Sequence, residues 1–365
     1  MIQGERYVLD KNEKPVKVYG PDDKPHTLFG AKNNDYMFRF IVDKQLMHAR
    51  FFHGLCNIKG FEPFLKTVLF EYFNRTENRL HFVKDVNTIA SPIAEEELKD
   101  PCWGKTFEGD CASAQPLNEV YRLPEELDPL GRCFSYKLEM NEDVFMAFTK
   151  ASDGSPNAII ALLMANAILA ENPQASDRIV SGIAMDAHHV VGAEKAHHAL
   201  LRLLKLHHSK KLSAMPFSTQ ATCYRGMIFL QSDAEHSFPE LRASNQIGEM
   251  IQSMPTLEAK RNLARSAILS NLGATTFDVS YAGAMDFGEI NSYIKSVYAS
   301  ADIKHQKMMI EISCVNHKFF INIMQSFETD RYVKAMVKQL KAANISCKCK
   351  EVEMMESMIA DSPLI

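Results

Sequence analysis

The sequence lacks several features that mark particular classes of protein. Lys and Arg together number 41 against 45 Asp and Glu, a net charge of −4, and no dense basic block interrupts that balance. This composition argues against a general nucleic-acid-binding protein. No apolar run reaches the ~18 residues that a membrane span needs. The first six residues hold no basic stretch leading into an apolar one, so we expect neither a membrane span nor a secretory signal.

Cysteine is also sparse, with 8 residues in a chain of 365. They are too scattered for a disulfide-stabilised scaffold, which predicts a cytoplasmic location. Cys347 and Cys349 are close together, but no second ligand pair accompanies them. Adjacent side chains diverge on both helices and strands, so a histidine doublet seldom chelates one ion. We therefore expect no metal site, although the chain has three such doublets: His188-His189, His197-His198 and His207-His208.

What the sequence has is the composition of a protein with a large core, 46% hydrophobic and 24% charged. Strand and helix patterns alternate, with hairpin signals in both halves, which predicts an α/β fold with mixed sheets (α+β). We expect two lobes, residues 1–132 and 133–365. A long irregular crossover, from about Asn78 to Arg132, would close the first lobe, because five prolines interrupt any periodicity there.

Individual elements follow from hydrophobic periodicity and turn residues. Tyr36–Val42 and Gln45–His53 predict one hairpin, and Lys307–Val315 and Lys318–Gln325 predict another around Asn316-His317. The segment from His197 to Leu206 is ambiguous between helix and strand. The other expected strands are Tyr7–Leu9, Phe134–Glu139, Arg178–Met185 and Thr275–Tyr281. The other expected helices are Phe61–Asn74, Asn141–Lys150, Ser155–Ala170, Phe217–Leu230, Glu240–Ser253, Leu257–Leu269, Glu289–Tyr298 and Thr329–Ala343.

The most informative stretch runs from Met47 to Phe73. An alternating β pattern ends near His53, glycines interrupt it at Gly54 and Gly60, and a helical period begins at Phe61. A histidine between a rigid strand and a glycine-bearing loop is well placed for chemistry, because the strand fixes the imidazole beside a cleft. The alternative is a half-buried histidine that only bonds to backbone.

This stretch resembles the active-site signature of the chloramphenicol acetyltransferase-like, or condensation-domain, superfamily. There a strand delivers His-x-x-x-Asp-Gly before a helix, and bacterial alcohol-acetyltransferase-like members continue with Phe-Leu-Lys-Thr. His53, Gly54-Leu55 and Phe64–Thr67 match, whereas Asn57 replaces the aspartate and Ile58 a glycine. Later segments are similar to the second lobe of these proteins: Gly154–Ala158, Ser280–Gly283 and the final hairpin with its helix.

The resemblance implies a two-lobed fold with a cleft or tunnel between the lobes, and an acyltransferase without a tightly bound cofactor. The donor would be acyl-coenzyme A or acyl-pantetheine on an acyl carrier protein, and the acceptor a small alcohol or amine. His53 would be the general base and Ser280 the donor to the oxyanion. Asn57 and Gly60 would support the motif, and Asp186, after the expected second-lobe strand, would be a strand-end cap.

The departures from the pattern support an alternative, a degenerate and non-catalytic scaffold or carrier-binding module. Family members also carry a strand–helix–strand unit ahead of the sequence matching Tyr7, so we expect this lobe to be shortened or its start mis-assigned. A shortened sheet would favour self-association near Gln45–His53. Restoring the motif carboxylate as Asn57→Asp should be neutral to stabilising if an arginine is near and destabilising if none is. Asp286-Phe287-Gly288 echoes a motif of plant acyltransferases.

Overall fold

The computed structural model describes residues 2–3, 6–7, 12–23, 28, 30–84, 86–88, 91–102, 105–107, 120–175, 178–303, 306–350 and 353–356. Their strands are β1 (Ile2–Gln3), β2 (Arg6–Tyr7), β3 (Val18–Tyr19), β4 (Phe38–Asp43), β5 (Leu46–Phe51), β6 (Arg132–Asn141), β7 (Ile179–Asp186), β8 (Leu201–His208), β9 (Phe277–Ala284), β10 (Met308–Val315), β11 (Lys318–Gln325), β12 (Cys347–Cys349) and β13 (Glu353–Glu356).

The helices are α1 (Ile58–Glu77), α2 (Glu95–Leu98), α3 (Glu142–Ala151), α4 (Pro156–Glu171), α5 (Lys210–Ser213), α6 (Phe217–Gln231), α7 (Ala234–Ser253), α8 (Leu257–Leu272) and α9 (Arg331–Ala342). Four short 3-10 helices accompany them: η1 (Ala31–Asn33), η2 (Pro173–Ala175), η3 (His188–Val191) and η4 (Gly288–Tyr293). Among the described residues, only the bent pair of α3 and α4, at 79° to each other, has the length and hydrophobicity to cross a membrane; no single helix has both.

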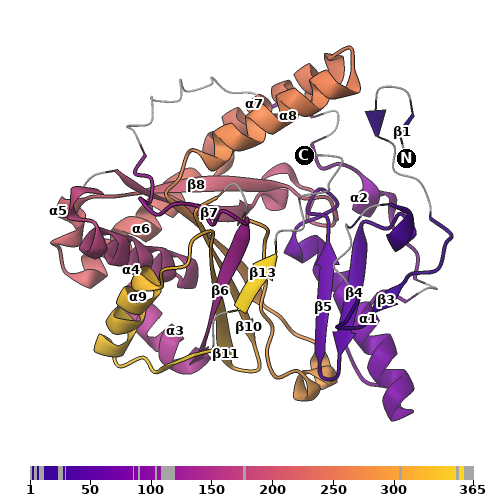
Figure 1. Ribbon diagram of the computed structural model, residues 1–365, viewed down its shortest axis with the longest axis horizontal. Helices are drawn as coiled ribbons and strands as arrows, with labels where there is room; N and C mark the ends of the chain where they lie inside the picture. Colours follow the sequence, from indigo (N-terminus) through magenta and orange to yellow (C-terminus); the bar gives the residue numbers. More distant parts are fainter. Residues whose placement is uncertain are drawn as a thin grey trace.

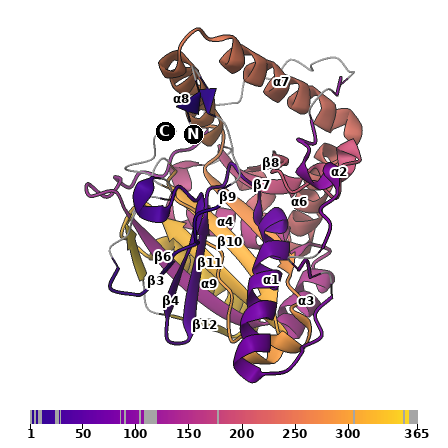
Figure 2. The ribbon, with the colours of Figure 1, turned by 90° about the vertical axis from the view of Figure 1, so that its right-hand side faces the viewer.

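A large mixed sheet and a small sheet dominate the architecture (Figures 1 and 2). The large sheet has the order β12-β6-β11-β10-β9-β7-β8, with β13 also paired to β6, and it contains both parallel and antiparallel pairs. The small sheet has the order β3-β4-β5 and lies beside the large one with α1. The mixed α/β fold expected from the sequence is confirmed, whereas the lobe boundary at residue 132 stays a prediction.

The main core fills one face of the large sheet. Helix α4 is apolar on all sides and buried along most of its length, packed against α6, α9 and the sheet strands. A helix with this composition must be surrounded by other elements, because no side of it would be stable in water. The opposite sheet face has a second cluster, in which Ala282, Val315 and Phe320 contact α1 through Leu65 and Leu69. The helix that follows the His53 turn therefore packs on this inner face.

Both predicted hairpins are confirmed. Strands β10 and β11 pair antiparallel with Val315 opposite Lys318, and the turn residues Asn316 and His317 have φ values of 50° and 58°. Such left-handed values at both central positions are those of the two-residue turns that match strand twist. Strands β4 and β5 also pair antiparallel, with Asp43 opposite Leu46, and Lys44 in their turn has a φ of 49°. Among the described residues, β5 is an edge strand, and self-association there stays a prediction.

Three sequence-based expectations need correction. The segment Glu289–Tyr298 is not an amphipathic helix: η4 ends at Tyr293, and an extended segment follows. The ambiguous stretch from His197 is strand β8, which begins at Leu201. Helix α7 begins at Ala234 and not at Glu240, because Asp233 caps it by accepting a hydrogen bond from the His236 amide at 2.8 Å. Periodicity favours a helix over 289–298, but the side chains of Asn316 and Ser313 bind the backbone carbonyls of residues 291, 294 and 297, which a continuing α-helix would use itself.

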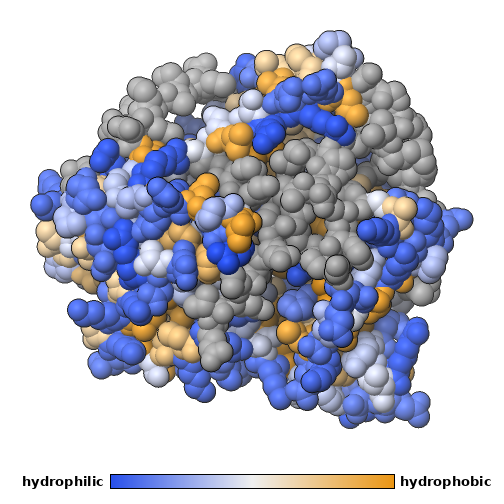
Figure 3. Space-filling model, in the orientation of Figure 1, coloured by the Kyte–Doolittle hydropathy of each residue, from blue (hydrophilic) through white to orange (hydrophobic). Residues whose placement is uncertain are grey.

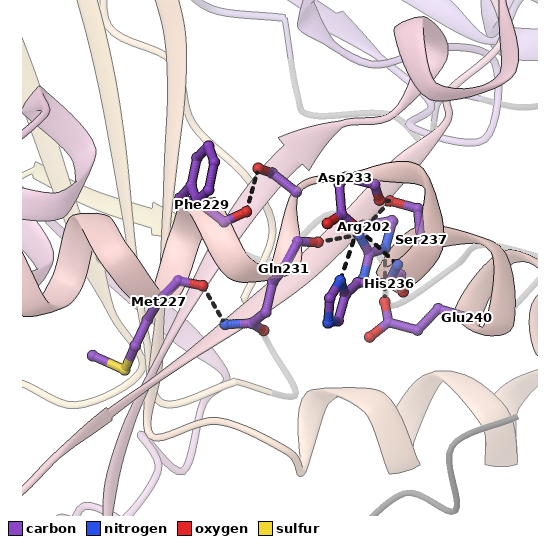
Figure 4. A network of polar contacts seen from close by, with 9 residues as sticks. Arg202, Met227, Phe229, Gln231, Asp233, His236, Ser237 and Glu240 are labelled. Atoms are coloured by element: carbon purple, nitrogen blue, oxygen red, sulfur yellow. Dashed lines mark hydrogen bonds and ion pairs between the residues drawn. The ribbon is translucent and has the colours of Figure 1, made fainter.

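The base of the α7–α8 hairpin is anchored to the large sheet by Arg202 of β8 (Figure 4). The buried guanidinium donates to the carbonyls of Gln231 and His236, to Ser237 Oγ at 2.6 Å and to Glu240 Oε2 at 2.9 Å. A charged group is stable in such a position because four of its five N–H donors, with at least one on each nitrogen, have acceptors. Beyond this anchor the hairpin projects from the top of the molecule in Figure 1, and α8 has no buried residue among those with described side chains.

Candidate functional site

His53 lies in a turn between β5 and α1, two residues beyond the last strand residue, Phe51. Its ring is exposed, and its Nδ1 lies 3.0 Å from the carbonyl oxygen of Cys56. A carbonyl can only accept, so Nδ1 carries the proton and donates this hydrogen bond. The remaining nitrogen, Nε2, then has the lone pair that a general base requires. The expected strand over Gln45–His53 is thus too long by two residues at its end and by one at its start.

Asn57 both begins α1 and connects it to the large sheet. It is 3% exposed, and its Oδ1 accepts a hydrogen bond from the Gly60 amide at 2.9 Å, which is the geometry of an N-cap. Its Nδ2 donates to Asp186 Oδ2 at 3.4 Å. The cap lets α1 begin at Ile58, so Gly60 lies inside the helix and does not break it, contrary to the expected start at Phe61.

Asp186, at the end of β7, gathers a set of polar partners. Its Oδ1 accepts from the His188 amide at 2.9 Å and from His188 Nδ1 at 2.8 Å, and Lys59 Nζ lies 3.8 Å from Oδ2. Burial raises the pKa of this carboxyl, but the His188 hydrogen bonds outweigh that effect and lower it to about 2. The Asp186 hydrogen bond raises the pKa of His188, whose Nε2 also contacts the His198 carbonyl at 2.7 Å. Asp186 is a strand-end cap, as expected.

At this junction the amide of Asn57 thus faces the carboxylate of Asp186. Replacing Asn57 with aspartate would put two carboxylates at hydrogen-bond distance in a buried position, with the partly exposed Lys59 as the nearby cation. We expect Asn57→Asp to lower the free energy of unfolding by about 1–3 kcal/mol at pH 7. Urea unfolding measures this loss.

The matched control is Asn141→Asp, because Asn141 caps α3 in the same way at an exposed position, accepting from the Val144 amide at 3.0 Å. Aspartate caps as well as asparagine and complements the helix dipole, so this variant should be neutral or slightly more stable. Equal stabilities of Asn57→Asp and the wild type would show that a cation does reach the site.

Gly60 has a steric role at the same junction. A Cβ atom built there would lie 2.3 Å from the carbonyl oxygen of His197 and 2.8 Å from the Cβ of Cys56. His197 also contacts Gly60 through Nδ1, which lies 3.4 Å from the Gly60 carbonyl oxygen. Only a residue without a side chain allows α1 to approach the segment between η3 and β8 this closely.

We therefore expect Gly60→Ala to destabilise the protein by about 1–3 kcal/mol, because backbone atoms would have to move. Gly248→Ala in α7 is the matched control: nothing lies within 4 Å of its added Cβ, so the usual helical gain of about 0.5–1 kcal/mol should appear. Thermal unfolding of both variants measures the two effects. A stabilised Gly60→Ala protein would contradict the close approach.

Ser280 lies on β9, on the inner face of the large sheet. It shares that face with Ala282, whose side chain belongs to the cluster in contact with α1. The strand register places Glu311 of β10 opposite Ser280, and hydrogen bonding by the Ser280 hydroxyl lowers the pKa of the Glu311 carboxyl, against the larger effect of burial. Among the interactions of the described residues, none joins Ser280 to His53. The roles assigned to both residues stay predictions, as does the cleft between lobes.

Asp286-Phe287-Gly288 has a structural role. Asp286 Oδ1 accepts from the Gly288 amide at 2.8 Å, and Gly288 has a φ of +58°. A Cβ there would lie 2.3 Å from the Phe82 carbonyl oxygen. Glu289 completes the contact, since its amide donates to that oxygen at 3.0 Å and its carboxylate accepts from the Phe82 amide and Arg79. This turn therefore fastens the segment that follows α1 to the large sheet.

Two buried acids on the inner face, Asp278 and Glu311, were not among the site residues predicted from the sequence. They are 7% and 9% exposed, and burial raises their pKa values to about 6 and about 7. A glutamate inside the apolar run Met308–Val315 was the available signal, because a charged residue in a buried strand is rare unless it has a function or a partner.

The histidine doublets do not assemble into a metal site. Within the described part of the chain, no group of three or more His, Cys, Asp or Glu side chains could hold a metal ion. His197 instead pairs with Glu97 at 3.0 Å, and His208 lies 3.2 Å from the Tyr224 hydroxyl. A shallow cavity of about 310 Å³ lies elsewhere, lined by residues of α4, α5 and the segments next to them, including Asn166 and Lys210.

No protein-family model matches the chain, and no curated protein matches its sequence. Solved structures do match its fold. The nonribosomal peptide synthetase FmoA3 (S1046A) superposes with a TM-score of 0.57 at 11% identity, covering 98% of this chain and 36% of FmoA3. Polyketide synthase associated protein 5 from Mycobacterium tuberculosis superposes with a TM-score of 0.53 at 10% identity, covering 90% of this chain and 79% of that one.

At these identities the likeness defines the fold. The chain has the two-lobed, mixed-sheet fold of the chloramphenicol acetyltransferase-like and condensation-domain proteins. Its spatial arrangement therefore agrees with the superfamily that the His53 segment resembles, while the activity has to be argued from the residues themselves.

Proposed function

We propose that this protein is an acyltransferase that moves an acyl group from a thioester of coenzyme A or of carrier-bound pantetheine to a hydroxyl or amine acceptor. The observation that carries the proposal is the geometry of His53. The Cys56 carbonyl accepts from Nδ1–H, so in the neutral imidazole the lone pair is on Nε2, at the exposed turn before α1. The fold and the motif resemblance support the same assignment. The reducing cytoplasm would suit its free cysteines, such as the exposed Cys223.

In this mechanism His53 Nε2 takes the proton of the acceptor as its oxygen or nitrogen attacks the thioester carbonyl. The carbonyl oxygen gains negative charge, and the Ser280 hydroxyl donates a hydrogen bond to it. The tetrahedral intermediate then collapses, the C–S bond breaks, and the thiolate takes the proton from His53. Asn57 and Gly60 do no proton transfer: they fix the start of α1 and thereby the turn that holds His53.

Thiol release from acyl-coenzyme A and acyl-pantetheine thioesters, measured with and without a panel of alcohols and amines, tests the proposal. We expect release that depends on the acceptor and matches the acylated product found by mass spectrometry. Thiol release that no acceptor accelerates would overturn it.

The second candidate function is a non-catalytic scaffold or carrier-binding module. Asn57 favours it, because its amide is committed to Asp186 and the motif carboxylate is gone. Binding of a pantetheine-loaded carrier protein without any acceptor-dependent turnover would support this alternative over the enzyme.

A further inference from the structure

Glu311 and Ser280 form a polar pair inside an otherwise apolar part of the large sheet. They lie opposite each other on the parallel strands β10 and β9, with their side chains on the same face of the sheet. Residues on the other face of these strands, Val279, Ile310 and Ile312, belong to the main core. The pair faces the same side as Ala282 and Val315, which contact α1. Glu311 is thus the cross-strand neighbour of Ser280, the proposed donor to the oxyanion, on the inner face of the large sheet.

The protonation state of Glu311 decides which way the Ser280 hydrogen points. An ionised carboxylate can only accept, so it would take the hydroxyl hydrogen for itself. A neutral carboxyl group can donate to Ser280 Oγ, which leaves the hydroxyl hydrogen available to a substrate oxygen. Burial raises the pKa of Glu311 to about 7, and the hydrogen bond from Ser280 opposes that rise. Both states are therefore populated near neutral pH.

Other ionisable groups around this face have partners of their own. Asp278 bonds to Gln306, Lys137 lies 5.4 Å from the Tyr298 ring centroid, and Glu139 pairs with Lys318 at 2.8 Å. On α1, Lys66 pairs with Glu62 at 3.0 Å. Further ionisable groups of the described elements that pack on this face include Lys59, Glu71 and Arg75 of α1, Glu289 and Tyr293 of η4, and Lys295, Tyr298 and Asp302 of the segment that follows it.

We propose that Glu311 is a positioning residue, whose neutral carboxyl group donates to Ser280 Oγ and directs the Ser280 hydroxyl toward the oxyanion. This inference rests on the proposed acyl transfer and adds the titration of Glu311 to it. Activity then requires a neutral carboxyl group at Glu311, so the rate falls as Glu311 ionises.

The test compares pH–rate profiles of the wild type, Glu311→Gln and Ser280→Ala. The wild-type rate should fall about tenfold per pH unit above about pH 7. Glutamine always donates through its amide, so Glu311→Gln should keep its rate over this range, which a purely structural role would not produce. Ser280→Ala should be slow at every pH. A Glu311→Gln profile that falls in parallel with the wild type would overturn the inference.

A readout without turnover separates this inference from the proposed function. Infrared difference spectra can follow the carboxyl C=O band of Glu311, identified by its absence in Glu311→Gln. In Ser280→Ala the lost donor should shift the titration of that band to higher pH. An unshifted titration would overturn the pairing. A shifted titration in a protein that transfers no acyl group would support the pairing and reject the proposed function.

Discussion

Replacing His53 with alanine is expected to lower the rate of acyl transfer by about 10²–10⁴-fold, the usual loss when a general base is removed. His53 Nε2 is the proposed base that takes the proton from the acceptor, and no other histidine in residues 52–57 could replace it. Among the interactions of the described residues, the exposed His53 ring makes one hydrogen bond, to the Cys56 carbonyl. The free energy of unfolding of His53→Ala should therefore differ little from that of the wild type. Initial rates of thiol release at saturating donor and acceptor, together with urea unfolding, measure both quantities.

His236→Ala is the control for removal of a histidine, because His236 is exposed on α7 and pairs only with Asp233. Its rate should equal that of the wild type. If His53→Ala transfers acyl groups as fast as the wild type, His53 is not the base; if neither protein shows acceptor-dependent turnover, the scaffold function takes its place. A slow His53→Ala protein that has also lost stability would instead indicate a structural role for the turn.

The second large effect concerns stability and pH. Asp278 and Glu311 have folded-state pKa values of about 6 and about 7, raised by burial above their ordinary values of 3.8 and 4.5. A raised pKa means that the folded state binds the proton more tightly than the unfolded state. Each acid therefore stabilises the fold fully below about pH 4, and this contribution is lost as pH rises through 6 and 7. The loss is on the order of 3 kcal/mol for each acid at pH 8.

Asp278→Asn and Glu311→Gln should remove these losses, so each variant should gain stability relative to the wild type as pH rises from 5 to 8. His188 and His208 titrate in overlapping ranges, so the difference between variant and wild type is the quantity to compare. Asp143→Asn, an exposed acid at the start of α3, should show no such trend. Parallel stability curves for Glu311→Gln and the wild type would mean that Glu311 is hydrated in the folded state.

Much of the fold could be predicted from the sequence because the signals are local. Alternating residues around short turns define the two hairpins, and Asn141 marks the start of α3. Helix α4 is evident from its apolar composition. The failed helix over 289–298 depended on distant groups: Asn316 Nδ2 bonds to the carbonyls of Asn291 and Ile294, and Ser313 Oγ to that of Val297. Periodicity within a segment does not report such partners.

The candidate site, like the fold, could be predicted from the sequence only where the signal is local. His53 and Asn57 could be identified from the pattern of the stretch itself, and Asp186 could be seen as a strand-end residue. Their meeting could not be predicted, because 129 positions separate Asn57 from Asp186. The pairing of Ser280 with Glu311 depends on the order and register of β9 and β10. Strand order depends on how the whole sheet packs, which no single segment encodes.

The contacts at the two ends of α1 have a mechanical consequence. Asn57 and Gly60 hold its beginning against the large sheet, and the Phe82 contact with Gly288 and Glu289 holds the segment after its end. The same helix also packs on the small sheet, because the Phe61 ring stacks on that of Phe51 with centroids 4.1 Å apart and Phe64 contacts Phe38. Helix α1 therefore couples the two sheets mechanically. The turn that holds His53, residues 52–57, lies between these contacts, and amide hydrogen exchange should be faster there than in α1. The position of the proposed base thus depends on the contacts of one helix with both sheets.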